Sequence, residues 1–168
     1  MTARIVILTG HHLCHNPRVI KAAGALAKAE YEVTVLGGWF DPLLKARDEM
    51  LMTSLPFGFI PVIDSTRDAS RRLGLRVRRK LGSLMHKIGH LDNRWQLGYA
   101  YSELRRAANR RAAALYIAHS EQAMAVATDL LRDGRSVGVD MEDWFSEDLL
   151  PEVRRYRPLQ LQIGRAHV

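Results

Sequence analysis

The chain has 168 residues, of which 47% are hydrophobic and 26% are charged, a balance that suits one folded domain and excludes a disordered chain. Its single cysteine, Cys14, excludes an internal disulfide, and no uncharged stretch reaches the roughly 20 residues of a membrane helix. We therefore expect a cytoplasmic protein, and its formal net charge of +7 favours anionic partners.

The first third of the chain predicts one β–α–β unit. Ile5–Leu8 is a continuous apolar run, which is typical of a strand buried on both faces in a parallel sheet. Asn16 is suited to cap a helix and Pro17 to begin it, and an amphipathic stripe follows them. A second run, Glu32–Leu36, predicts the next strand, and Gly37-Gly38 is expected to end it.

The middle of the chain is less regular, and its last third returns to alternating strands and helices. Residues 39–63 hold prolines and aromatic side chains, whereas an apolar stripe at steps of three and four begins after residue 67. This alternation indicates an α/β fold with a doubly wound parallel sheet. The expected elements are strands at Phe59–Ile63, Ala114–Ala118 and Val137–Val139, and helices at Arg67–His90, Leu97–Ala113, Gln122–Arg132 and Ser146–Arg155.

The last residues do not resemble the end of a domain. Ile163–Val168 is the translation of a common short-read sequencing adapter, and a codon for Gln162 can supply the bases that precede it. We therefore expect residues 162–168 to be non-native and residues 1–161 to form one incomplete domain. The native protein is expected to continue beyond about Leu161.

Polar residues follow four of the expected strands, at the strand ends where open α/β sheets bind ligands. His119 and Asp140 close neighbouring strands about 4.8 Å apart, so their side chains are expected to meet and to form a general-base pair. The alternatives are that His119 is an ordinary loop histidine and that the acids after Val139 cap the next helix. The four loops hold Thr9, Gly10, His11 and His12; Gly37, Gly38 and Trp39; His119, Ser120 and Glu121; and Asp140, Glu142 and Asp143.

Two kinds of bound group are not expected. The cluster from His11 to His15 offers imidazole and thiolate ligands, but no second pair with metal-ligand spacing follows it, so no metal is predicted. The first loop lacks G-x-G-x-x-G, and Gly37-Gly38 stands where a ribose-binding acid is expected, so no nicotinamide cofactor is predicted.

Five segments, taken in their order and spacing, resemble one enzyme family: Arg4–Thr9, Asn16–Val19, Ala25–Leu36, Leu115–His119 and Val139–Phe145. The pattern is similar to the N-terminal domain of glycosyltransferases with the GT-B fold, family 4. Glu30 departs from it, because the family usually has glycine at this helix end, and a left-handed residue there costs about 1–2 kcal/mol.

The resemblance implies a Rossmann-like domain that binds the acceptor, facing a second domain that binds most of the nucleotide sugar without a metal or cofactor. It implies transfer of a sugar from a nucleotide-sugar donor to a lipid-linked or polysaccharide acceptor. Without the second domain, we expect no transfer and at most feeble nucleotide-sugar binding. The residues it implies are His119 and Asp140 as catalytic, and Gly10, His11, His12, Asn16, Arg18, Glu142 and Asp143 as substrate-binding.

Two other functions remain open at this stage. A nucleotide-sugar epimerase of the same fold also needs the missing half. A non-catalytic Rossmann-like binding module, such as a receiver domain, needs paired acids after the first strand, where this chain has His11-His12.

Positive charge is concentrated between Arg67 and Arg111, which hold 13 Lys and Arg against 3 Asp and Glu. The cations flank the apolar stripe Leu73–Leu91, as in an amphipathic helix that lies on a membrane, so we expect salt-sensitive docking on an anionic membrane surface. The alternative is a solvated arginine-rich helix. No nucleic-acid partner is expected, because interleaved aromatic residues are missing. The membrane-surface residues are Arg71, Arg72, Arg76, Arg78, Arg79 and Lys80.

Overall fold

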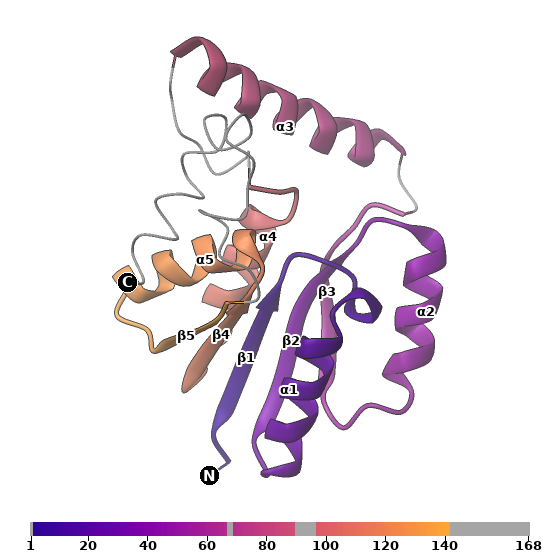
Figure 1. Ribbon diagram of the computed structural model, residues 1–168, viewed down its shortest axis with the longest axis vertical. Coiled ribbons are helices and arrows are strands. Elements are labelled where there is room, and N and C mark those ends of the chain that lie inside the picture. Colours follow the sequence, from indigo (N-terminus) through magenta and orange to yellow (C-terminus); the bar gives the residue numbers. More distant parts are fainter. Residues whose placement is uncertain (1, 67–68, 90–96, 142–168) are drawn as a thin grey trace.

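The computed structural model describes residues 2–66, 69–89 and 97–141 (Figure 1). The strands in this part form one parallel sheet in the order β3-β2-β1-β4-β5. The chain builds outward from β1 to β3 and then returns to place β4 beside β1, which makes a Rossmann-like doubly wound sheet with its switch point between β1 and β4. The strands are β1 (Arg4–Thr9), β2 (Glu32–Trp39), β3 (Gly58–Asp64), β4 (Leu115–His119) and β5 (Val137–Asp140).

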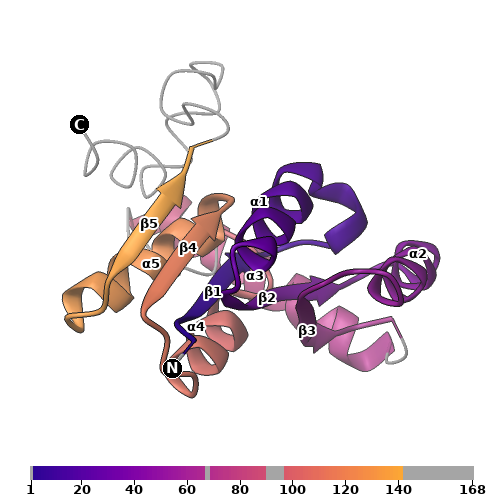
Figure 2. The same ribbon diagram turned by 90° about the horizontal axis from the view of Figure 1, so that it is seen from below.

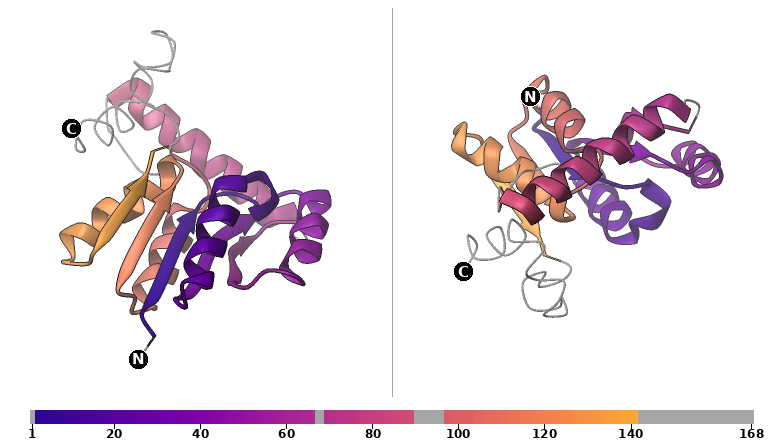
Figure 3. Two further views of the ribbon diagram at one scale, coloured as in Figure 1. Left: turned by 60° about the horizontal axis from the view of Figure 1, so that its bottom comes forward. Right: turned by 90° about the horizontal axis from the view of Figure 1, so that it is seen from above.

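Helices cover both faces of the sheet (Figure 2). One face carries α1 (Pro17–Lys28), α2 (Pro42–Met52) and the short 3-10 helix η1 (Leu13–His15). The other carries α4 (Tyr101–Asn109) and α5 (Glu121–Arg132). The long helix α3 (Ala69–Gly89) lies across the end of the sheet that holds the carboxyl ends of the strands (Figures 1 and 3). This end therefore carries both the strand-end loops and the most basic helix.

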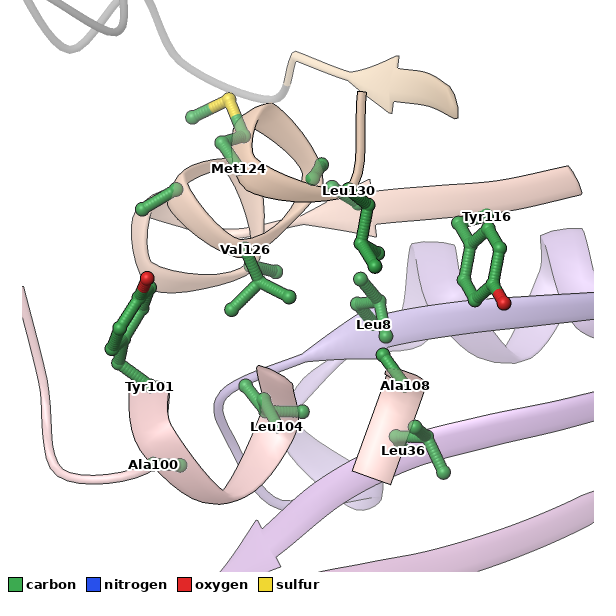
Figure 4. Close-up of a cluster of buried hydrophobic side chains, with 14 of the residues drawn as sticks. Leu8, Leu36, Ala100, Tyr101, Leu104, Ala108, Tyr116, Met124, Val126 and Leu130 are labelled. Carbon is green, nitrogen blue, oxygen red and sulfur yellow. The ribbon is translucent and has the colours of Figure 1, made fainter. Parts of the chain in front are cut away.

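Alternation along the central strand builds the two layers of the core. Ile5 and Ile7 point into the cluster beneath α1, whereas Val6 and Leu8 point into the cluster beneath α4 and α5, and none of the four exceeds 5% exposure. Figure 4 shows the second cluster, in which Leu8 lies among side chains of α4 and α5. Each fully buried side chain of this size contributes about 1.5–3 kcal/mol. An apolar run on both faces of β1 is therefore what a sheet covered on both sides requires.

The prediction of an irregular segment over residues 39–63 is wrong in its first half, where α2 forms. Pro42 begins this helix, and the carboxylate of Asp41 caps it by accepting hydrogen bonds from the amides of Leu43 and Leu44 at 2.8 and 3.1 Å. The side chains of α2 that are buried against the protein are Lys45 and Asp48. An apolar stripe could not reveal this helix, because its buried face is charged.

The expected end of the second strand at Gly37-Gly38 is also wrong. β2 continues through both glycines to Trp39, with a shift in its register to β3 between them. A Cβ atom at Gly37 would lie 2.8 Å from the carbonyl oxygen of His11 and 2.6 Å from the ring of Phe59. Glycine is needed here because the loop after β1 approaches the strand closely, and not because the strand stops.

Smaller differences concern helix ends. The helix expected at Leu97–Ala113 is the shorter α4, and Asn16 occupies the cap position of α1 without a side-chain capping bond. Glu30, just after α1, has a left-handed φ of 65°. In the part of the chain that is described, no helix combines the length and the apolar character needed to cross a membrane. The helix expected at Ser146–Arg155, the residues Glu142 and Asp143 and the adapter-like end lie outside the described residues.

Candidate functional site at the carboxyl edge

The carboxyl ends of β1, β4 and β5 lie side by side at the switch point. Thr9 is the register partner of His119, and His119 is the register partner of Asp140. Register partners in a parallel sheet project to the same face, so these three side chains share the face that α1 covers. The strand order alone therefore gathers a hydroxyl, an imidazole and a carboxylate at one edge.

Arg18 joins this group from the first turn of α1. Oδ1 of Asp140 lies 2.7 Å from Nη2 of Arg18, and Oδ2 lies 3.0 Å from Nδ1 of His119. We name these three residues the strand-end cluster. Its side chains range from buried to half-exposed: 7% of His119, 30% of Asp140 and 48% of Arg18 is accessible. His119 is therefore buried, whereas Asp140 and Arg18 form an accessible, charged rim beside it.

The chemistry of the cluster follows from its donors and acceptors. A carboxylate accepts only, so Nδ1 of His119 carries the proton that it donates to Asp140, and this tautomer leaves the lone pair on Nε2. The bond from Arg18 is charge-assisted, which makes it short and holds the carboxylate in place. An imidazole fixed in one tautomer beside an anchored carboxylate can orient a hydroxyl group or transfer its proton.

Gln122, in the first turn of α5, ties together the loops around the cluster. Its Nε2 donates to the carbonyl of Gly10 at 3.0 Å, and its Oε1 accepts from the amide of Ala100 at 3.2 Å. The side chain is 4% exposed, and a Cβ atom at Gly10 or at Gly98 would overlap it. Gln122 therefore fixes the loop after β1 against the start of α4 and the start of α5.

Ser120 stores backbone strain between β4 and α5. Its φ of 84° and ψ of 155° lie in a region that only glycine adopts readily, at a cost of about 1–3 kcal/mol. Its Oγ accepts a long hydrogen bond of 3.4 Å from the amide of Gly10. Strain of this kind gathers at functional sites, and here it lies directly beside His119.

A second histidine, His12, lies at the same edge but is enclosed by the protein. Its Nε2 accepts hydrogen bonds from the amides of Phe40 and Asp41 at 2.9 and 3.1 Å. Its Nδ1 must then carry the proton, and it donates to Oδ2 of Asp48 at 3.1 Å. Both ring nitrogens are occupied and the residue is 5% exposed, so His12 shapes the loop from within.

Asp48 on α2 is the centre of this second network. Its carboxylate also accepts from the amides of Leu13 and Cys14 and from the indole nitrogen of Trp39, at 2.7–3.1 Å. Burial by itself raises the pKa of Asp48, but the hydrogen bonds from His12, Cys14 and Leu13 together hold the pKa below its usual value. Burial and the neighbouring Asp48 raise the pKa of Cys14 to about 11, so its thiol stays protonated at neutral pH.

The structure brings together some of the predicted site residues and separates others. Gly10, Arg18, His119 and Asp140 converge on the strand-end cluster or its bracing loop, although their roles stay predictions. Asn16 donates instead to the carbonyl of His12 at 2.6 Å. The exposed His11 accepts a backbone bond from Gly38 at 3.2 Å. All six predicted membrane-surface residues lie on α3, and two of them, Arg76 and Lys80, have described side chains, which are exposed.

Sequence reasoning missed three residues that organise this edge. Asp48 lies on α2, which has no apolar stripe that would predict it, and the sequence pattern predicts Gln122 only as the start of a helix. Thr9 was placed in the first loop without a role, yet its Oγ1 is buried with no hydrogen-bond partner in the described part of the chain. The Asp41-Pro42 capping signal could have revealed α2 and therefore Asp48. Among the described residues, no group of three or more His, Cys, Asp or Glu side chains could hold a metal ion.

The comparisons with known proteins identify no family for this chain. No protein-family model and no curated protein matches the chain. Among solved structures, the C-terminal domain of a hydrogenase from Pyrococcus furiosus is similar, with a TM-score of 0.45 and 14% sequence identity. That similarity covers 83% of this chain and 91% of the hydrogenase domain, and it carries no inference about activity.

Proposed function

We propose that this chain is the acceptor-side domain of a glycosyltransferase with the GT-B fold, similar to family 4. In this proposal the enzyme moves a sugar from a nucleotide-sugar donor to a lipid-linked or polysaccharide acceptor. The observation that carries the proposal is the strand-end cluster of His119, Asp140 and Arg18 at the switch point. The segments that resemble the family place two of these residues, His119 and Asp140, at the ends of their strands.

The cluster suits a sugar because it offers a donor, an acceptor and a cation within one short arc. Asp140 can accept a hydrogen bond from a sugar hydroxyl on its accessible side, while Arg18 can donate to an oxygen or to a phosphate of the acceptor. In this proposal His119, whose orientation Asp140 fixes, orients or deprotonates the attacking hydroxyl.

The nucleotide sugar enters this proposal as a substrate that the second domain binds for the most part. The loop after β1 supports this assignment of most nucleotide-sugar contacts to the second domain. Its Gly10 carbonyl is already used by Gln122, and its Gly10 amide is held by Ser120 only at 3.4 Å. One weakly held amide can meet a donor oxygen, but a full phosphate cradle needs several backbone amides and a glycine-rich loop.

Calorimetric titration of the chain tests the proposal. The ligands are soluble oligosaccharides, a polyprenyl-phosphate-linked saccharide in detergent, and UDP- and GDP-sugars. At least one acceptor is expected to bind, and Asp140→Asn and Arg18→Ala are each expected to weaken it about tenfold or more. Arg4→Ala is the matched control, because Arg4 pairs with Glu32 at the amino end of the sheet with similar exposure.

Two results would contradict the proposal, and they separate its rivals. Micromolar binding of a UDP- or GDP-sugar would place the donor site in this chain, as an epimerase or another nucleotide-binding module requires. Absence of binding to every saccharide, or equal losses in Arg18→Ala and Arg4→Ala, would leave a binding module without a sugar site.

A further inference from the structure

The apolar side chains of α3 are largely exposed to solvent. Leu73, Val77, Leu81, Leu84 and Ile88 follow one another at steps of three and four residues, so they form one stripe along the helix. Each is between 47% and 75% exposed. In a surface helix of a globular domain such a stripe is expected to face the core. Here it is the largest exposed group of apolar side chains on any one helix that the structure describes.

A different side of α3 meets the body of the domain. Leu75, which lies off the apolar stripe, is partly buried and packs against the core cluster beneath α4 and α5. Gly82, two turns further along, is buried as well. Leu75 and Gly82 lie on the side of α3 opposite the apolar stripe, and the stripe itself stays largely exposed.

Cations border the stripe. Arg76 and Lys80 are exposed, one turn apart on α3. They line a hollow of about 650 Å³ together with Ser83, Tyr99 and three side chains of the stripe, Leu73, Val77 and Leu84. The sequence of α3 holds seven Lys and Arg and no Asp or Glu. A surface that covers this helix must therefore be apolar where it meets the stripe and negatively charged where it meets the flanking cations.

We propose that α3 docks on an anionic lipid bilayer, with the apolar stripe in the interfacial region and with Arg76 and Lys80 on lipid phosphates. This occupant matches both the stripe and its cationic border. A second copy of the chain fits less well, because pairing two such helices would oppose cation to cation. Since α3 lies across the carboxyl edge of the sheet, docking brings this edge of the domain close to the membrane (Figures 1 and 3).

Vesicle co-sedimentation of the full chain tests the docking. The probes are vesicles of phosphatidylcholine alone and of phosphatidylcholine mixed with phosphatidylglycerol, at about 50 mM and about 500 mM salt. Partitioning is expected to be at least tenfold stronger on the anionic vesicles at low salt and to fall steeply at high salt. This result does not depend on the proposed enzymatic function, because no sugar takes part.

Two pairs of variants locate the contact, and each pair has a matched control. Val77→Ser with Leu84→Ser removes part of the stripe, while Leu43→Ser with Met50→Ser removes side chains that are 76% and 75% exposed on α2. Arg76→Glu with Lys80→Glu reverses the charge of the residues that border the stripe. Lys28→Glu with Arg47→Glu makes the same change of charge on the exposed faces of α1 and α2. The α3 variants are expected to lose at least tenfold in partitioning, and the controls to keep it. Circular dichroism checks that each variant stays folded.

Three results would overturn the docking proposal. The first is equal partitioning on neutral and anionic vesicles at low salt. The second is an equal loss in the α3 variants and in their controls. The third is self-association in analytical ultracentrifugation that the Val77→Ser and Leu84→Ser changes abolish, without any binding to vesicles, because that would show a second copy covering the stripe.

Discussion

Two histidine–aspartate pairs lie at the same edge of the sheet and differ in what surrounds the carboxylate. The His12–Asp48 and His119–Asp140 pairs have nearly the same separation, 3.1 and 3.0 Å, and the histidines are 5% and 6% exposed. Asp48 is fully buried and accepts three further hydrogen bonds from the protein. Asp140 is 30% accessible, and its other described partner is the half-exposed Arg18.

The difference shows that residue type and distance do not decide the role of such a pair. The Asp48 carboxylate is saturated by protein donors, so the pair holds a loop in place and offers nothing to a ligand. The Asp140 carboxylate keeps an accessible side, and Arg18 adds a cation there. A ligand can reach the accessible side of Asp140, whereas the enclosed carboxylate of Asp48 can only stabilise the fold.

The largest expected effect is on stability, from Asp48→Ala. The change leaves His12, two backbone amides and an indole N–H buried without their acceptor, so we expect a loss of about 3–5 kcal/mol in the free energy of unfolding. Asp140→Ala is expected to cost less, about 1–2 kcal/mol, because it leaves one buried donor, Nδ1 of His119, without its acceptor, while the half-exposed Arg18 can turn to solvent. Urea unfolding of both variants measures the difference, and similar losses would break the distinction between the two pairs.

The second prediction concerns activity and applies to a protein that also carries the donor domain. His119→Ala is expected to lower turnover at least about a hundredfold, the usual cost of removing a positioned acid–base or orienting group. Its midpoint of thermal unfolding should fall less than half as far as in His12→Ala, which strands Asp48 and two amides. If His119→Ala unfolds early and keeps its turnover, His119 is structural and leaves the site.

Acid is expected to weaken the contact between α2 and β3, which the Lys45–Asp64 ion pair holds together. Burial alone raises the pKa of Asp64, but hydrogen bonds from Lys45 and Thr66 lower the pKa to about 2. Because the folded pKa lies below the unfolded one, the unfolded chain binds more protons between about pH 4 and pH 2, and stability falls as the pH falls through that window.

Asp64→Asn is therefore expected to cost about 1 kcal/mol at neutral pH, an amount already reduced for the solvent that screens this partly accessible pair, and to flatten the acid dependence. Unfolding by urea at pH 4, 3 and 2 measures both effects. Glu32→Gln is the control, because the Arg4–Glu32 pair is about half exposed and is worth little. An acid dependence that Asp64→Asn leaves unchanged would contradict the assignment.

The sequence carried enough information for the strands of the parallel sheet but not for the charged helix α2. The apolar runs of β1, β2 and β4 are visible because both faces of these strands are buried, and burial of that kind leaves a continuous pattern. α2 has no such pattern, since Lys45 and Asp48 are the side chains that face inward. Their burial depends on partners from distant parts of the chain, among them His12 and Asp64.

The candidate site was predictable to the same extent. His119 and Asp140 could be placed together because strand order and register determine which strand ends meet. The closed state of His12 could not be predicted, because its partners Phe40, Asp41 and Asp48 come from the turn before α2 and from α2 itself. The sequence shows two similar histidines, and their environments separate them only after folding.

The smallest expected effect compares two residues with left-handed backbone. Glu30, with φ of 65°, ends α1 near the amino end of the sheet, and Ser120, with φ of 84°, lies beside His119. Glycine relieves strain at both positions but adds freedom to the unfolded chain, so Glu30→Gly and Ser120→Gly are each expected to stabilise the fold by about 0.5–1 kcal/mol. Urea unfolding measures these gains. Only Ser120→Gly is expected to weaken binding of the acceptor found by calorimetry, because the strained turn holds Gly10 and His119 in place. If both variants bind the acceptor equally well, the strain at Ser120 serves the turn alone and is not part of the site.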